Sequence, residues 1–412
     1  MLPAGSPLSA WLTWLETLSP NEIDLGLERV RDVLDRLDLD FPEHVLIIGG
    51  TNGKGSSVAM TGALLQAAGY SVGSYTSPHI VDYNERIAVG GRLASDAEII
   101  AAFEGIEAVR NDVPLTYFEY GTLAAFVVFA AADLDVWLLE VGMGGRLDAT
   151  NVVDPTACLI TNVALDHCAW LGDNVEAIAA EKAGIMRPGI PVVYGDVDVP
   201  EAILRHADDI GARLLLRDRD YSLDGIPQPG LPGRFQVANA AAVVAMLDAA
   251  GLEAAASEEL VARVLPEVRL AGRAQRTERD GVQWLLDVAH NPAAATQVGS
   301  LLAAERSGGR TIAVIGVLDD KDAEGIVAPL DEHVDLWVAL PADSPRAIPA
   351  GELARRIANA TNRPCLIATS LPDALQAARR EASEGDRILV AGSFYVVGPA
   401  LQALGLYSPP KS

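Results

Sequence analysis

Residues 49–57 form a glycine-rich loop, GGTNGKGSS, between a short apolar run and an Ala- and Leu-rich stretch. Glycines let backbone N–H groups turn toward an anion, and the N-terminus of a following helix adds its dipole. In such a loop Lys54 reaches the outer phosphates of a nucleotide, and Ser56 or Ser57 offers a hydroxyl to Mg²⁺. The strict P-loop pattern, G-x-x-x-x-G-K-[ST], has a glycine at the position of Ile48. A glycine-rich turn without a ligand is therefore the alternative interpretation. Lysine and serine in register favour phosphate binding.

Two polar residues follow later apolar runs. Glu140 ends the run 135–140, and His167 comes shortly after the run 157–161. Ligands of a parallel α/β sheet bind at the carboxyl ends of its strands, so Ser56, Glu140 and His167 should converge. A carboxylate is a natural Mg²⁺ ligand. Histidine is a less usual one, and a loop histidine that only supports the site is an equal alternative.

Lys182 lies on the apolar stripe of a predicted helix at 174–186, in phase with Val175, Ile178 and Ala179. Such a lysine can extend its ammonium along the core to water. Alternatively, burial lowers its pKa, and the neutral amine can react with CO₂ to form a carbamate. The helical pattern alone gives the two interpretations about equal weight.

Short apolar runs that alternate with helical patterns predict parallel strands in βαβ units, and hence an α/β fold. The predicted strands are 45–48, 136–141, 157–161, 192–194, 284–286, 311–315, 336–340 and 387–391. Helical patterns at 236–250 and 258–265 interrupt this alternation, which restarts at Trp284. We therefore expect a domain boundary within 266–283, with a nucleotide-type domain at 1–270 and a smaller Rossmann-like domain at 271–412.

The bulk properties restrict the class of protein. The chain has 412 residues, enough for two or three domains, and its longest apolar run, 123–132, is too short to span a membrane. Three widely spaced cysteines and the lack of an export signal favour a reducing, cytoplasmic location. A net charge of −25 argues against binding to nucleic acid or anionic membranes. Anionic ligands would therefore need local positive charge.

The phosphate loop belongs to a series of motifs in a fixed order. The others are SPHIVDYNERI at 77–87, TYFEYGT at 116–122, LEVGMGGRLDATN at 139–151, LDHCAWLG at 165–172, EKAGIMRPG at 181–189 and LDVAHNP at 286–292. Together they resemble the folate branch of the Mur ligase superfamily, the dihydrofolate synthases and folylpolyglutamate synthases. The resemblance covers nearly the whole chain and implies a Mur-ligase-type ATP-binding domain followed by the smaller Rossmann-like domain.

The resemblance also implies site residues and ligands. The implied metal ligands are Ser56, Ser77, Glu140 and His167, which would hold two Mg²⁺ ions. A monovalent cation is also compatible with the resemblance. ATP is implied to contact Gly53, Lys54, Gly55, Ser56, Asn239, Arg273, Asp287 and His290. The implied catalytic residues are Lys54, His167, Lys182 and Arg273, with Lys182 carbamylated to N6-carboxylysine. Asp287, at the end of a predicted strand, suits a ribose hydroxyl. Spacing to Asp287 favours Arg273 over Arg234 as the phosphate contact.

A folate pocket is implied as well. Its residues are Asp24, Leu25, Gly26, Leu27, Thr116, Tyr117, Phe118, Glu119, Leu147, Asp148 and Ala149, with the loop 77–91 as a cover. From the residues alone, 24–30 would be the start of an amphipathic helix. Tyr117 and Phe118 could sandwich a flat ring, although single aromatic residues more often pack in the core.

The implied reaction is ATP-dependent ligation of L-glutamate to dihydropteroate, and then to tetrahydrofolates, through an acyl phosphate. We expect a monomer with small-molecule substrates. Ligation to a cell-wall precursor is an alternative, but only about 45 residues precede the phosphate loop, which is less than a sugar-nucleotide domain needs. An ATP-binding module without ligase activity is a second alternative. It would release no phosphate in response to glutamate.

Overall fold

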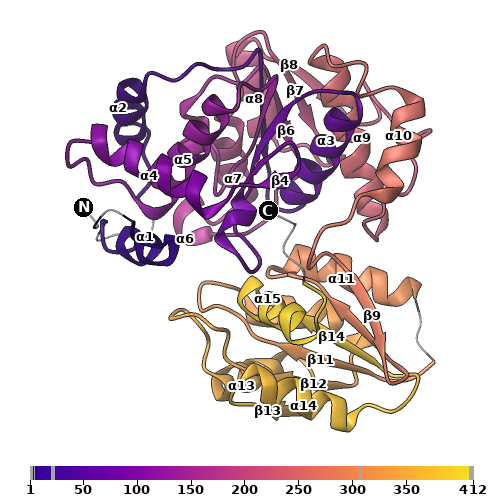
Figure 1. The fold of residues 1–412 in the computed structure, drawn as a ribbon. Coiled ribbons are helices and arrows are strands. Elements are labelled where there is room, and N and C mark those ends of the chain that lie inside the picture. Colours follow the sequence, from indigo (N-terminus) through magenta and orange to yellow (C-terminus); the bar gives the residue numbers. More distant parts are fainter. Residues whose placement is uncertain (1–2, 4, 20–23, 306–307, 408–412) are drawn as a thin grey trace.

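The computed structural model describes residues 3, 5–19, 24–305 and 308–407. Figure 1 shows a larger body, coloured indigo to salmon, above a smaller body coloured orange to yellow. Each body has its own β-sheet with helices on both faces. The predicted α/β class is therefore confirmed. Among the described residues, every helix is too short or too polar to span a bilayer.

The larger sheet has eight strands. They are β1 (His44–Gly49), β2 (Val72–Tyr75), β3 (Ile87–Val89), β4 (Arg92–Leu93), β5 (Val136–Glu140), β6 (Ala157–Ile160), β7 (Pro191–Tyr194) and β8 (Arg213–Leu216). Their order is β4-β3-β2-β5-β1-β6-β7-β8, and all neighbours from β2 to β8 pair in parallel. β5 and β6 are buried along their whole length, because helices cover both faces of the sheet.

Helices cover the two faces of the larger sheet unequally. One face carries α1 (Leu8–Leu15), α2 (Glu28–Leu37), α4 (Asp96–Val109), α5 (Tyr117–Ala131), α7 (Val175–Ala183) and α8 (Glu201–Ile210). The other face carries α3 (Lys54–Ala67), α9 (Arg234–Ala249) and α10 (Glu258–Val264). The short helices of this body are α6 (Cys168–Leu171), η1 (Tyr83–Arg86), η2 (Ala149–Val152) and η3 (Leu265–Glu267).

The smaller body holds a six-stranded sheet in the order β13-β12-β11-β14-β10-β9. The strands are β9 (Gln275–Arg279), β10 (Val282–Leu286), β11 (Thr311–Ile315), β12 (Leu336–Ala339), β13 (Cys365–Ile367) and β14 (Arg387–Ala391), with β9 antiparallel. One face packs against α11 (Pro292–Ala304), α12 (Ala323–Val327) and α13 (Ala350–Ala360), and the other against α14 (Leu371–Glu381) and α15 (Phe394–Ala403). η4 (Ala328–His333) follows α12.

The order of the larger sheet explains where a ligand can bind. β1 lies between β5 and β6, and the chain crosses from β1 to β2 on one side but later builds β6 to β8 on the other. A reversal of this kind opens a crevice at the carboxyl ends of the strands. The glycine-rich loop after β1, Glu140 at the end of β5 and the segment after β6 therefore meet at one edge.

The eight predicted strands all occur, with bounds within two residues of those expected. The sequence pattern missed β2, β3, β4, β8, β9 and β13. These strands are short, and several carry glycine, serine or charged residues that weaken the apolar signal. A helix start at Asp24 is wrong, because α2 begins at Glu28.

Candidate active site

A cleft of about 670 Å³ is lined by residues of both bodies at the carboxyl ends of β1, β5 and β6. It contains every residue expected to contact ATP or metal. These are Gly53, Lys54, Gly55, Ser56, Ser77, Glu140, His167, Lys182, Asn239, Arg273, Asp287 and His290. The fold thus brings together groups that lie up to 237 residues apart in sequence, from Gly53 to His290. A cleft of this size accommodates a nucleotide.

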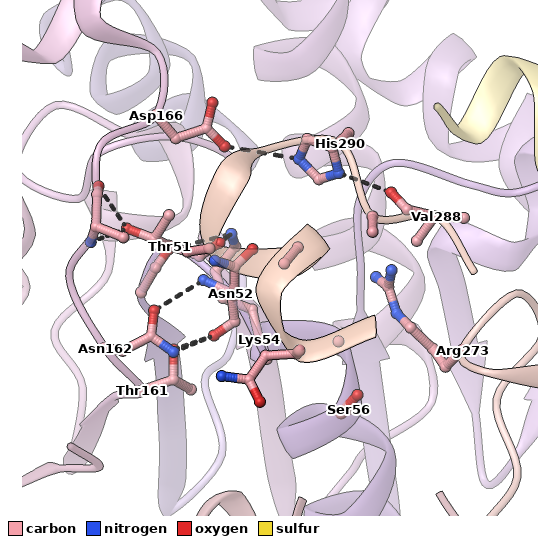
Figure 2. A pocket seen from close by; sticks show the side chains of 18 of the residues that line it. Thr51, Asn52, Lys54, Ser56, Thr161, Asn162, Asp166, Arg273, Val288 and His290 are labelled. Atoms are coloured by element: carbon pink, nitrogen blue, oxygen red, sulfur yellow. Dashed lines mark hydrogen bonds and ion pairs between the residues drawn. The ribbon is translucent and has the colours of Figure 1, made fainter. Parts of the chain in front are cut away.

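The glycine-rich loop is fixed from the end of β6. The Thr161 hydroxyl donates to the Asn52 carbonyl oxygen at 2.6 Å, and the Asn162 amide donates to the same oxygen at 3.1 Å (Figure 2). Gly50 is required there, because a Cβ would lie 1.8 Å from Thr161 Oγ1. Gly53, the N-cap residue before α3, has φ 87°. The loop backbone is therefore held in one shape around the helix N-terminus.

Two lysines converge on one carbonyl of this loop. Lys54 Nζ and Lys182 Nζ donate to the Gly50 carbonyl oxygen at 3.1 and 3.0 Å. Lys182 is 4% exposed, so its ammonium does not extend to water. Burial, assisted by the charge of Lys54, lowers the pKa of Lys182 to about 7. An ammonium that extends to water is therefore not observed, and the carbamate on Lys182 stays a prediction.

Glu140 is buried and faces the N-terminus of α3. Its Oε2 accepts a hydrogen bond from the Ser77 backbone N–H at 3.2 Å, and both carboxylate oxygens lie 3.7 Å from where a Cβ of Gly55 would be. Burial raises the pKa of Glu140, although Lys54 opposes this shift. Of the two loop serines, Ser56 lines the cleft and accepts a hydrogen bond from Gln236 at 3.2 Å. Ser57 is buried outside the lining.

His167 lies in a different environment from Glu140. Its backbone has φ 51°, a left-handed conformation that is uncommon for a residue other than glycine. The Nε2 atom is 3.4 Å from Lys321 Nζ. Burial lowers the pKa of His167 to about 4, with Lys321 and Lys54 contributing. The ring is therefore neutral near pH 7, the form that binds metal ions. Among the described residues, no three His, Cys, Asp or Glu side chains form a complete metal cluster.

The smaller body contributes Arg273, Asp287 and His290. Arg273 lies over the Phe394 ring at 5.2 Å, and Asp287 accepts backbone hydrogen bonds from Ala274 and Ala289, each at 2.8 Å. The bond from Ala274 thus fixes the segment that connects the two bodies at the end of β10. His290 Nδ1 lies 2.9 Å from the Val288 carbonyl oxygen, which can only accept, so Nδ1 carries a proton.

Arg234 and Arg273 both line the cleft but differ in position. Arg234 is exposed at the first turn of α9. Arg273 is partly buried, and burial lowers its pKa while Asp287 and Glu140 oppose this shift. Its Nη2 atom is 3.8 Å from the Cβ position of Gly55 in the phosphate loop. The choice of Arg273 as the phosphate contact therefore has geometric support.

The expected folate residues form a separate cluster outside the lining of the cleft. Arg29 of α2 joins two parts of this cluster, with ion pairs to Asp24 at 3.1 Å and Glu119 at 2.9 Å. Thr116 and Glu119 also cap α5 reciprocally. Leu25, Gly26 and Leu27 lead into α2 as partly buried, non-helical residues.

The aromatic part of this cluster reaches the cleft at one point. Phe118 packs on Gly142, where a Cβ would lie 2.5 Å from the Phe118 ring, and Gly142 lines the cleft. Asp148 accepts hydrogen bonds from Met143 N–H and from Thr150, and so closes the loop that contains Leu147. Ala149 begins η2 beside it and is buried. Phe118 and the nucleotide cleft are therefore neighbours.

Sequence reasoning missed the contact between the two bodies. Asp166, just before His167, accepts hydrogen bonds from Lys321 Nζ at 2.5 Å and from Asn291 Nδ2 at 2.9 Å. Figure 2 shows Asp166 facing His290, whose Nε2 is 3.6 Å away. Burial alone would raise the pKa of Asp166, but these neighbours hold it well below its usual range. No helical or strand pattern marks Lys321, which follows β11. Only the tertiary structure therefore reveals its ion pair with Asp166.

The comparisons with known proteins cover nearly the whole chain. Residues 48–191 match the Mur ligase middle domain, and residues 272–394 match the Mur ligase glutamate ligase domain. The dihydrofolate synthase/folylpolyglutamate synthase of Escherichia coli is 40% identical over 97% of this chain and 96% of its own. The enzyme of the same name from Mycobacterium tuberculosis is 32% identical over 95% of this chain and 92% of its own.

Solved structures agree with these matches. E. coli FolC in complex with DHPP and ADP has a TM-score of 0.93 and 39% identity, covering 98% of this chain and 99% of that one. A bifunctional folylpolyglutamate synthase/dihydrofolate synthase with Mn, AMPPNP and L-glutamate bound has a TM-score of 0.90 and 41% identity, with the same coverage. The relatives thus bind an adenine nucleotide and a divalent metal. The chain belongs to the dihydrofolate synthase/folylpolyglutamate synthase family of ATP-dependent Mur ligases.

Proposed function

We propose that this chain ligates L-glutamate to dihydropteroate, and further glutamates to tetrahydrofolates, with the site residues assigned above. The γ-phosphoryl group of ATP passes to the acceptor carboxylate, which gives an acyl phosphate and ADP. The amine of glutamate then attacks the acyl carbon, and phosphate leaves. The observation that carries the proposal is the shared cleft, in which the phosphate loop, Glu140 and Arg273 meet next to Gly142, on which Phe118 packs.

The side chains around the loop suit phosphoryl transfer by positioning and charge. Lys54 lies in the loop, and Arg273 approaches it from the smaller body. Both cations can stabilise negative charge on the transferring group. Asn239 lies against Gly53, where a Cβ would be 2.8 Å from its Nδ2 atom, and Asp287 and His290 line the part of the cleft beside the smaller body. Because both bodies supply contacts, their approach would complete the site.

The donor set fits Mg²⁺. Among the described residues, the single hydrogen bond to the buried Glu140 carboxylate comes from the Ser77 N–H, so the oxygens retain free lone pairs. The hydroxyls of Ser56 and Ser77 and the neutral ring of His167 complete the expected ligands. Bound Mg²⁺ would neutralise phosphate oxygens during the transfer. A carbamate on Lys182, whose lowered pKa favours reaction with CO₂, would add an anion next to this group.

Phosphate release tests the proposal directly. The protein is assayed with ATP, Mg²⁺, L-glutamate and either dihydropteroate or a tetrahydrofolate, with each component omitted in turn. We expect phosphate release to require all components and the product mass to increase by one glutamyl residue. ATP binding without glutamate-dependent phosphate release would instead identify a nucleotide-binding module without ligase activity.

Arg273 and Arg234 provide a matched pair for the phosphate contact. We expect Arg273→Gln to lower kcat by roughly 10²-fold, because it removes a partly buried cation beside the phosphate loop. Arg234→Gln removes an exposed arginine of the same cleft and should change kcat by less than about threefold. Steady-state kinetics with saturating glutamate measures both variants. The reverse order of effects would assign the contact to Arg234.

The proposal also includes a cytoplasmic monomer that acts on small molecules. The three cysteines, Cys158, Cys168 and Cys365, are all unpaired in the described structure, which suits a reducing compartment. The net charge of −25 disfavours nucleic acid as a partner. Size-exclusion chromatography with light scattering tests the monomer.

A further inference from the structure

Arg86 is a buried cation for which the described part of the chain provides no carboxylate partner. The residue is 8% exposed and lies where η1 ends and β3 begins. Its Nε donates to His79 Nδ1 at 2.9 Å, and its guanidinium lies over the rings of Tyr83 and Tyr117 at 5.5 and 5.7 Å. Aromatic faces stabilise a cation only partly, and a buried charge without a counter-ion is costly.

A second polar group in the same place also lacks a partner. The Tyr83 hydroxyl is buried and, among the described residues, forms no hydrogen bond. Tyr75 supplies one further neutral contact to Arg86 through its hydroxyl. Buried polar groups are nearly always hydrogen-bonded, so each exception requires an explanation. A buried cation and an orphan hydroxyl thus lie together among Tyr75, Tyr83 and Tyr117, without a carboxylate of the described residues at ion-pair distance.

The position of Arg86 indicates which anion this is. Tyr117, which stacks on Arg86, precedes Phe118, and Phe118 packs on Gly142 at the wall of the nucleotide cleft. The charge of Arg86 also lowers the pKa of Glu140, the carboxylate that faces the phosphate loop. Arg86 therefore lies between these aromatic side chains and the phosphate loop, where the γ-phosphoryl group is transferred in the proposed reaction.

We propose that Arg86 binds the acceptor carboxylate, the group to which glutamate is ligated, and holds it toward the phosphate loop. This inference rests on the proposed function and extends it by naming a residue for one end of the substrate. An aryl carboxylate suits this combination of side chains, because its ring can lie against aromatic side chains while its anionic end meets a guanidinium. In a protein with a net charge of −25, such a local cation is needed to attract a carboxylate.

His79 prepares the guanidinium for this role. Its Nδ1 atom accepts a hydrogen bond from Arg86 Nε at 2.9 Å. The Nε edge of the guanidinium is thus occupied. The terminal Nη groups remain for Tyr75 and the incoming carboxylate.

The test compares two ligands that differ only in the carboxylate. Binding of dihydropteroate, and of the analogue in which hydrogen replaces the carboxylate, is measured by calorimetry with wild-type protein and with Arg86→Gln, both in the presence of ADP and Mg²⁺. We expect Arg86→Gln to weaken dihydropteroate binding by roughly 10–100-fold, the usual range for a lost charge-assisted hydrogen bond. Binding of the analogue should change by less than about twofold, because the analogue has no group for Arg86.

Matched variants make every outcome informative. Arg92→Gln, which removes an exposed arginine of the neighbouring strand, should leave both affinities unchanged. Arg86→Lys keeps the charge and should retain part of the preference for the carboxylate; it also replaces Arg86→Gln in the comparison if the latter does not fold. Equal losses for both ligands, unchanged binding of both, or weakened binding of Mg²⁺-ADP instead would overturn the assignment. Failure of the wild-type protein to bind dihydropteroate would instead refute the proposed function.

Discussion

Replacement of Glu140 by alanine should abolish turnover while nucleotide binding persists. We expect kcat to fall by at least roughly 10²–10³-fold, because the variant lacks the carboxylate that faces the phosphate loop and is proposed to hold Mg²⁺. Nucleotide binding should survive, because the loop is fixed by Thr161 and Asn162 independently of Glu140. Phosphate-release kinetics and titration with ADP measure the two properties separately.

Glu140→Gln separates catalysis from stability. Burial raises the pKa of Glu140, so its ionised form is disfavoured in the folded protein without metal. The amide has nearly the same shape and no charge, and it should therefore leave the free energy of unfolding unchanged or raise it by about 1 kcal/mol. Activity should still be lost, and the stabilisation of the wild-type protein by Mg²⁺ should disappear in thermal unfolding. Normal turnover in either variant would remove Glu140 from the proposed metal site.

Loss of the Lys182 amine should have a similarly large effect on turnover. We expect both Lys182→Met and Lys182→Arg to lose roughly 10²–10³-fold in kcat, because neither side chain can form the proposed carbamate and only the second keeps a positive charge. With ¹³C-bicarbonate, the wild-type protein should show a carbamate carbon resonance that is absent from both variants. The chain has only four lysines, so the assignment is direct. A resonance that persists in Lys182→Met would place the carbamate elsewhere.

The lowered pKa of Lys182 also predicts how stability depends on pH. The pKa is about 7 in the folded protein and 10.5 for an ordinary lysine, so between these values the unfolded chain binds one proton more than the folded chain. The free energy of unfolding of the wild-type protein should therefore rise relative to Lys182→Met as pH increases from about 7, by up to about 1.4 kcal/mol per pH unit. Urea unfolding in CO₂-free buffer at pH 7, 8 and 9 measures the difference. Parallel curves would show that the ammonium is solvated.

The central strands could be predicted from sequence, whereas the peripheral strands could not. β1, β5, β6, β11 and β14 each contain a continuous apolar run of at least four residues, because both faces of their sheets are covered. Such runs are easily recognised in the sequence. β2 contains glycine and serine and β9 is mostly exposed, so neither has a clear period. Their pairing depends on neighbouring strands that lie far away in sequence.

The same distinction applies to the site: some of its features could be predicted from the sequence and others could not. The sequence by itself determined the phosphate loop, the polar residues at the strand ends and the family, because these depend on local residue types in a fixed order. Only the tertiary structure decided that Lys182 is buried on the Gly50 carbonyl, that Arg273 approaches the phosphate loop and that Asp166 pairs with Lys321 across the two bodies. It also decided that Arg86 is buried without a carboxylate partner among the described residues. Burial and pairing of charge depend on contacts between distant segments. No local pattern of residues records those contacts.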